Sequence, residues 1–172
     1  TEAGFERAEQ LLRDQLELYG TRRPKSRALV HHRLARVLHK AEGSESALRE
    51  LEVAAKIDPA HPEVLEELGR VAFELGRGER SERAFRALLL VLKPGAEPTT
   101  KGPSRAEAFV YLGEIAALRD DPIRATEFIE SAFEAAMESD FESKRLERAL
   151  RQRGRHELLA RVVETRLEKA SN

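Results

Sequence analysis

The chain has 172 residues, of which 35% are charged and 41% are hydrophobic, and its formal net charge is −1. This balance excludes a disordered polyelectrolyte and provides no overall basic field for nucleic acid. Cysteine is absent, which excludes disulfides and thiolate metal sites. No segment contains the ~20 apolar residues of a membrane-spanning helix, so we expect no membrane partner and favour a cytoplasmic location.

The first predicted element is an amphipathic helix over residues 5–19. We expect residues 1–22 to be a partial unit, the second helix of a pair whose first helix is missing. Because the chain opens at Thr1 without a methionine, we also expect it to be part of a larger protein. The apolar stripe of this helix consists of Phe5, Ala8, Leu12, Leu16 and Tyr19.

Three repeats follow, and they are visible as columns of similar residues that recur after 34 and then 44 positions. Several columns that share the same two steps indicate one repeated helix pair. We therefore expect repeat one at 28–61, repeat two at 62–95 and repeat three at 106–139. The columns are Leu34, Leu68 and Leu112; their small neighbours Ala35, Gly69 and Gly113; Ala47, Ser81 and Ala125; Leu51, Phe85 and Ile129; and Ala54, Leu88 and Ala132.

The longer second step indicates a loop insertion at 96–105. The stretch from Pro94 to Pro103 contains three prolines and two glycines, and it cannot continue a helix. The tripeptide Ser-Arg-Ala follows this loop at Ser104 and an earlier loop at Ser26. We therefore expect these two helix starts to be equivalent.

The C-terminal elements are predicted from helix-boundary signals. Asp121 directly before Pro122 is a strong start for the second helix of repeat three. Residues 140–172 form a degenerate helix pair that is broken at Gly154, which brings the total to about nine helices. The residues expected to pack inward in the last helix are Leu158, Leu159, Val162, Val163 and Leu167.

These features resemble the tetratricopeptide repeat (TPR) family in the 34-residue period, the leucine followed by a small residue, the alanine-rich second helix and the closing proline at Pro59. The resemblance covers residues 28–137. It implies an all-α fold, a right-handed solenoid of antiparallel helix pairs. It also implies a concave groove, lined by the first helices, that binds a partner's extended peptide or helix.

No group of residues is arranged for catalysis, so we expect no enzymatic activity and no cofactor. His31, His32 and His39 form the only histidine cluster, but Arg36 lies between His32 and His39 and would repel a cation. We therefore expect no metal site.

Each first helix is expected to present only a narrow strip of side chains to the groove. The strips are basic in repeat one, acidic in repeat two, nearly apolar in repeat three and basic in the C-terminal pair. Such zoning can select a partner and set its register, although charged strips are also what soluble helices show to water. The predicted partner-binding residues are His32, Arg33, Arg36, His39, Lys40, Glu63, Glu66, Glu67, Arg70, Glu74, Val110, Tyr111, Glu114, Lys144, Arg148 and Arg151.

The apolar strip of repeat three allows two interpretations. Either the insertion at 94–103 or the C-terminal helix pair covers Val110 and Tyr111, or these two residues anchor an apolar side chain of the partner. The position of the insertion directly before this helix favours burial.

The predicted function is a protein-interaction scaffold that binds a segment of another protein in its groove. The alternative is a structural spacer within a long solenoid that has no ligand of its own. The arginine-rich stretch 144–155 suggests nucleic acid as a third candidate, but the acidic strip and the scarcity of stacking aromatics oppose it. The family's clamp for a terminal carboxylate uses asparagines, and the only asparagine here is Asn172.

Overall fold

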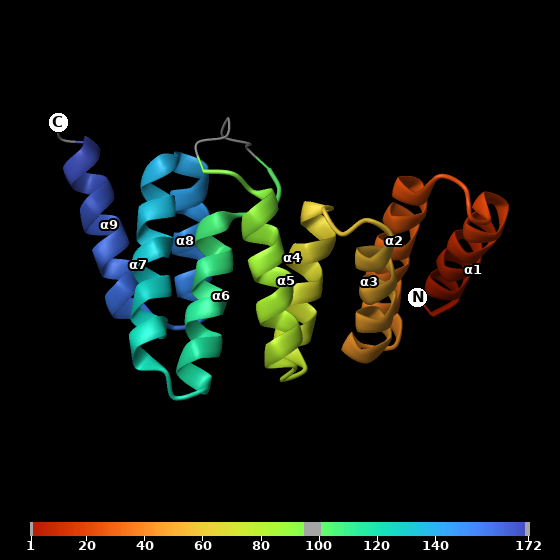
Figure 1. Cartoon of the computed structure of the whole chain (residues 1–172), viewed down its shortest axis with the longest axis horizontal. Coiled ribbons are helices and arrows are strands. Elements are labelled where there is room, and N and C mark those ends of the chain that lie inside the picture. The colour runs from red at the N-terminus through yellow and green to blue at the C-terminus, as the bar shows by residue number, and fades with distance from the viewer. Residues whose placement is uncertain (1, 95–100, 171–172) are drawn as a thin grey trace. The chain divides into compact units, whose positions relative to one another are not determined.

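The computed structural model describes residues 2–94 and 101–170, apart from the side chains of residues 165, 166 and 168–170. Within these ranges the chain forms nine α-helices and no strand. Figure 1 shows how these helices follow one another along the chain. The predicted all-α fold of helix pairs is confirmed. The helices are α1 (Glu2–Tyr19), α2 (Pro24–Ala41), α3 (Ser44–Ile57), α4 (Pro62–Glu74), α5 (Gly78–Val91), α6 (Arg105–Leu118), α7 (Pro122–Glu138), α8 (Asp140–Gln152) and α9 (His156–Ala170).

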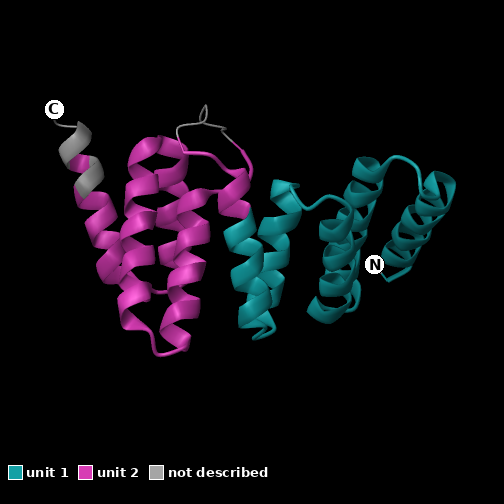
Figure 2. Cartoon of the chain, in the orientation of Figure 1, with its two compact units in different colours: residues 1–87 teal, residues 88–172 magenta. Residues whose placement is uncertain are grey.

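The helices fall into two compact units, coloured separately in Figure 2. The N-terminal unit is Thr1–Ala87, in which α1 packs on α2, α2 on α3, and α3 on α4. The C-terminal unit is Leu88–Asn172, in which α6 packs on α7 and α8, and α8 also packs on α7 and α9. The repeat boundaries within one solenoid remain a prediction.

In the N-terminal unit, the sequence columns mark a close approach between α4 and α5. A Cβ atom at Gly69 would lie 2.7 Å from the ring of Phe85, a distance that side chains do not tolerate. The Ser81 hydroxyl, from a third column, donates a 2.8 Å hydrogen bond to the carbonyl oxygen of Gly69. The small residue is therefore what lets the two helices meet. The equivalent residues of α2 and α3 share one buried cluster: Ala35, Ala47 and Leu51.

The same columns meet again between α6 and α7 of the C-terminal unit. A Cβ atom at Gly113 would lie 3.3 Å from the Ala125 carbonyl oxygen and from the side chain of Ile129. The predicted close approach at both glycines is therefore confirmed, although the contact at Gly113 is looser than the one at Gly69.

Helix starts follow the predicted chemistry in one place and depart from it in another. Asp121 caps α7 by accepting a hydrogen bond from the Arg124 backbone N–H, as predicted. However, α2 begins at Pro24 rather than at Ser26, because a proline already has the φ angle of a first helical turn. Ser104 does cap α6, so the prediction that the two Ser-Arg-Ala starts are equivalent is wrong. Within the predicted insertion, residues 95–100 lie outside the described residues.

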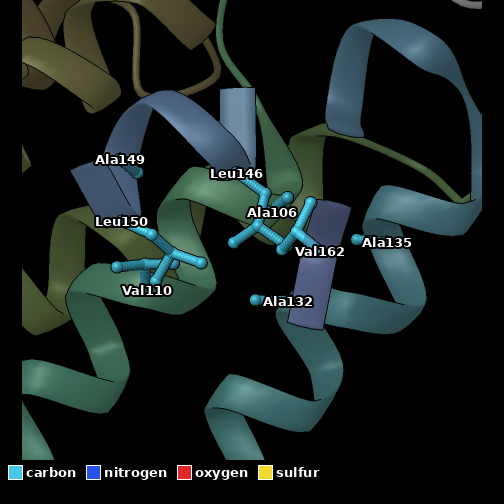
Figure 3. Packing of buried hydrophobic residues seen from close by; sticks show 8 residues of the cluster. All are labelled: Ala106, Val110, Ala132, Ala135, Leu146, Ala149, Leu150 and Val162. Carbon is cyan, nitrogen blue, oxygen red and sulfur yellow. The ribbon is translucent and has the colours of Figure 1, made fainter. Parts of the chain in front are cut away.

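The core of the C-terminal unit contains apolar residues from all four of its complete helices. Leu158 and Leu159 pack against this core, as predicted, and Val162 is buried in it. The inward packing predicted for Val163 and Leu167 is wrong, because their side chains are 41% and 63% exposed. The cluster shown in Figure 3 consists of Ala106, Val110, Ala132, Ala135, Leu146, Ala149, Leu150 and Val162.

Candidate functional site

Two of the predicted strip residues on α2 are bound to acidic residues of α4. His32 Nε2 donates to Glu67 Oε2 over 2.7 Å, and His39 Nε2 lies 3.8 Å from Glu74 Oε2. His39 follows His32 by seven residues on α2, and Glu74 follows Glu67 by seven residues on α4. The two contacts between these helices are therefore about two helical turns apart. The His32 side chain is 8% exposed. His32 therefore holds two helices together and has little surface left for a partner, and the contact predicted for it stays a prediction.

The contact between His32 and Glu67 affects the pKa of the Glu67 carboxyl group. Burial raises the pKa of the Glu67 carboxyl group, whereas the hydrogen bond from His32 and the charge of His32 lower it. The charges of Arg36 and Arg70 act in the same direction, so the pKa of Glu67 falls below its usual value. The negative charge of the α4 strip is thus engaged within its own unit.

The other acidic residues of α4 are also largely occupied or partly covered. Glu63 Oε2 lies 3.1 Å from His61 Nδ1 at the start of the helix. Glu66 and Arg70 are both half-buried. In the acidic strip predicted for repeat two, Glu67 and Glu74 therefore contact α2, whereas Glu63 contacts the residue that precedes its own helix.

The three remaining cations of the α2 strip differ from all of these. Arg33, Arg36 and Lys40 are exposed, and within the described part of the chain no carboxylate forms an ion pair with them. They line a hollow of about 460 Å³ between α1 and α2, which we call the α1–α2 hollow. None of the described residues that line it is acidic. Its remaining lining residues are Gly4, Phe5, Ala8 and Val37.

The predicted strip on α6 is covered. Val110 is 0% exposed and lies against Leu150 of α8 in Figure 3. The proposal that Val110 anchors a partner is therefore wrong, and the C-terminal helix pair is what buries it. Tyr111 is half-buried beneath the Arg153 guanidinium, which lies 4.0 Å from the ring centroid. Glu114 forms an ion pair with the same Arg153.

The predicted strip on α8 carries as many cations as the α2 strip, but two of them are paired. Lys144 Nζ is 2.5 Å from Asp140, and an Arg151 guanidinium nitrogen is 2.5 Å from Glu147. In both pairs the acid stands one helical turn before the cation. Arg148 is exposed.

Sequence reasoning missed the polar contacts that join α8 to α6. The Glu142 carboxylate accepts hydrogen bonds from the Ser104 hydroxyl at 2.5 Å and from the Ala106 backbone N–H at 2.9 Å. It thus caps the start of α6 from another helix. Arg145 pairs with Glu107 of α6 at 2.7 Å. The Ser-x-x-Glu spacing at Ser104 and Glu107 marks this helix start in the sequence, but it does not reveal a carboxylate that arrives from α8.

A second hollow of about 360 Å³ lies among α6, α7 and α9. Its charged residues already have partners: Arg155 lies 3.5 Å from Glu114, and Arg161 forms two hydrogen bonds of 2.9 and 2.8 Å with Glu130. The hydrogen bond from Arg161 lowers the pKa of Glu130 below its usual value. The charged residues of this hollow are therefore less available to a partner than the cations of the α1–α2 hollow are.

Among the described residues, no group of three or more histidines, cysteines or acids is placed to hold a metal ion. Over the same residues, no helix combines the length and apolar character required to cross a membrane.

No protein-family model and no curated protein matches the sequence. Solved structures match its fold. MamA is 15% identical over 100% of this chain and 94% of its own, with a TM-score of 0.64. BtubC (BKLC) from P. vanneervenii is 19% identical over 99% and 76% of the two chains, with a TM-score of 0.67. The TPR-like repeats of a kinesin light chain from Podosopora anserina are 19% identical over 96% and 88%, with a TM-score of 0.60.

At these identities the likeness shows the fold alone. The chain has a TPR-like helical repeat fold, as its sequence columns predict. Repeats of this type build extended surfaces that serve as protein-interaction scaffolds.

Proposed function

We propose that this chain is a non-enzymatic interaction scaffold whose N-terminal unit binds an acidic segment of a partner protein on α2. The observation that carries the proposal is the set of three exposed cations, Arg33, Arg36 and Lys40, which line one hollow without an acidic residue in its lining. The fold supports the general role, since helical repeats present side chains from rigid helices.

Electrostatics explain why these three cations matter more than the others. Lys144, Arg151 and Arg153 already have acidic neighbours, so a partner's carboxylate would have to compete for them. Arg33 and Lys40 have no such competitor among the described residues, and Arg36 influences Glu67 without forming an ion pair. An acidic segment at α2 therefore gains attraction and displaces no internal contact. Complementarity of this kind sets the choice of partner and the rate of association more than it raises affinity.

The spacer remains the second candidate. In that case the same three cations only keep the surface soluble, and no short acidic segment binds. The other predicted contacts stay predictions of the scaffold proposal: His39, Glu63, Glu66, Glu67, Arg70, Glu74, Tyr111, Glu114, Lys144, Arg148 and Arg151.

A binding titration separates the two candidates. A short fluorescent acidic peptide is titrated with the parent chain and with Arg36→Glu/Lys40→Glu, at about 0.01 M and about 0.15 M ionic strength. Two reversed charges should weaken binding roughly tenfold at the lower ionic strength, and less at the higher one, because salt screens exposed charges. Lys144→Glu/Arg151→Glu is the matched control, since it reverses two cations that are already paired, and it should bind within about twofold of the parent.

Two outcomes would count against the scaffold proposal. Equal binding by the parent and Arg36→Glu/Lys40→Glu at low salt would remove α2 from the site. Failure of the parent chain to bind any acidic peptide would favour the spacer.

A further inference from the structure

The α1–α2 hollow is not only basic, because its floor is apolar. Phe5 and Ala8 of α1 and Val37 of α2 line it together with the cations, and all three are half-buried. Gly4 also lines it and contributes no side chain, so the α1 side of the hollow is open there. A volume of about 460 Å³ lies within the range of clefts that hold organic ligands.

Helix geometry places the apolar floor between the charges. Val37 is four residues after Arg33 and three before Lys40, so all three lie on one face of α2. From Arg33 to Lys40 the helix rises by roughly 10 Å, which equals about three residues of an extended chain or two turns of a helix. A ligand that satisfies the whole site therefore has acids at both ends of such a span and an apolar group between them.

This arrangement discriminates among negatively charged ligands. A polyanion such as single-stranded nucleic acid would satisfy the cations, but its successive bases stack on successive aromatic side chains, and Phe5 is the one aromatic residue among the described residues that line the hollow. A lone terminal carboxylate would meet one of the cations and would leave the other two, and the apolar floor, without a partner.

We infer that the occupant is an internal acidic segment of a partner protein, with one bulky apolar side chain that enters the α1–α2 hollow between flanking carboxylates. This inference rests on the proposed function, because it specifies the partner of the same site. The flanking acids face Arg33, Arg36 and Lys40, and the apolar side chain covers Phe5 and Val37. Burial of a leucine-sized side chain should then strengthen binding by roughly tenfold or more over a purely acidic segment.

The test compares two peptides that differ at one position. One carries a leucine between two acidic clusters, and the other has serine in place of that leucine. On the parent chain the leucine peptide should bind roughly tenfold more tightly, and the difference should persist at about 0.15 M ionic strength because it is not ionic. Amidation of the peptide's C-terminus should change its affinity by less than about twofold, as expected for an internal segment.

A substitution that fills the hollow provides the second arm. Gly4→Leu adds a side chain to its lining without removing any core residue, and it should abolish the preference for the leucine peptide while the serine peptide still binds. Ala3→Leu is the matched control, because Ala3 is an exposed neighbour on α1 that does not line the hollow, and it should keep the preference. Thermal melting of both variants checks that the chain remains folded.

The outcomes separate this inference from the proposed function. Equal affinity for the two peptides on the parent chain would overturn the apolar anchor, as would a preference that survives Gly4→Leu. If the leucine preference fails but Arg36→Glu/Lys40→Glu still weakens the binding of both peptides, the basic strip of α2 remains a binding site. A single-stranded DNA of matched charge that binds as tightly as the leucine peptide would also overturn the inference, whereas weaker binding would support it.

Discussion

The basic strips of α2 and α8 look alike in the sequence, and they differ in the structure. Each helix carries three predicted contact cations. On α8, Lys144 and Arg151 pair with acids four residues earlier. On α2 the residues four positions before the cations are not acidic, and no ion pair within the described residues engages the cations. Those positions hold Leu29, His32 and Arg36.

This difference teaches that a count of positive charges does not locate a binding surface. A cation with an acid one turn before it on a helix is already satisfied in part, whereas a cation without one remains available to a partner. The same rule extends across helices in the C-terminal unit, where Arg145 and Arg153 pair with acids of α6. Charged side chains therefore help to hold α8 against α6 in the C-terminal unit, whereas the three cations of α2 face solvent.

The largest expected effect concerns this internal role of charge. Arg145→Met would leave the buried carboxylate of Glu107 without its cation, and we expect a loss of about 2–4 kcal/mol in the free energy of unfolding, measured by urea denaturation. Arg148→Met removes an exposed cation from the same helix and should cost less than about 0.5 kcal/mol. Equal effects of the two substitutions would mean that the α8 cations are no more engaged than those of α2.

The second effect compares packing in the two units. Gly69→Ala would force a Cβ atom to within 2.7 Å of the buried Phe85 ring, and we expect it to cost about 1–3 kcal/mol. At Gly113 the nearest atoms are 3.3 Å away, and the better helix propensity of alanine, about 1 kcal/mol, offsets the crowding. Gly113→Ala should therefore melt close to the parent. A larger loss at Gly113 than at Gly69 would reverse this ranking of the two contacts.

The repeat contacts could be predicted from the sequence, because a close approach of two helices requires a small residue at each recurrence of the period. Gly69 and Gly113 are therefore visible as a column. The burial of Val110 could not be predicted with equal certainty, because it depends on Leu150 of α8, in a helix pair that departs from the repeat pattern. The exposure of Val163 and the cap that Glu142 provides to α6 also depend on tertiary packing.

The candidate site was predictable only in part. Its three cations were among the predicted strip residues, but their availability depends on which neighbours are acidic. His32 belonged to the same predicted strip and is instead bound to Glu67, 35 residues away in the sequence. Two of the three apolar side chains of the hollow, Phe5 and Ala8, come from α1, which the sequence places on an incomplete unit outside the three repeats.

The smallest stability effect concerns pH. The pKa of Glu67 is lowered in the folded chain from its ordinary value of 4.5, so its contribution to stability is fully present above pH 4.5 and is lost as the pH falls through the lower folded value. The free energy of unfolding of Glu67→Gln should therefore fall less than that of the parent as the pH is lowered below 4.5. Glu79→Gln, an exposed carboxylate of α5, serves as the control. Parallel pH curves for Glu67→Gln and the parent would show that His32 and Glu67 are not coupled.

The most direct test of the central claim measures the availability of each arginine without altering the chain. An arginine-specific reagent, followed by mass spectrometry, gives the rate of modification at every site with and without the leucine peptide. Arg33 and Arg36 should react quickly in the free chain and become protected by the peptide. Arg145 and Arg153, whose side chains are 19% and 16% exposed and are paired with acids, should react slowly in both conditions. Protection at Arg145 or Arg153 with no change at Arg33 and Arg36 would contradict the account.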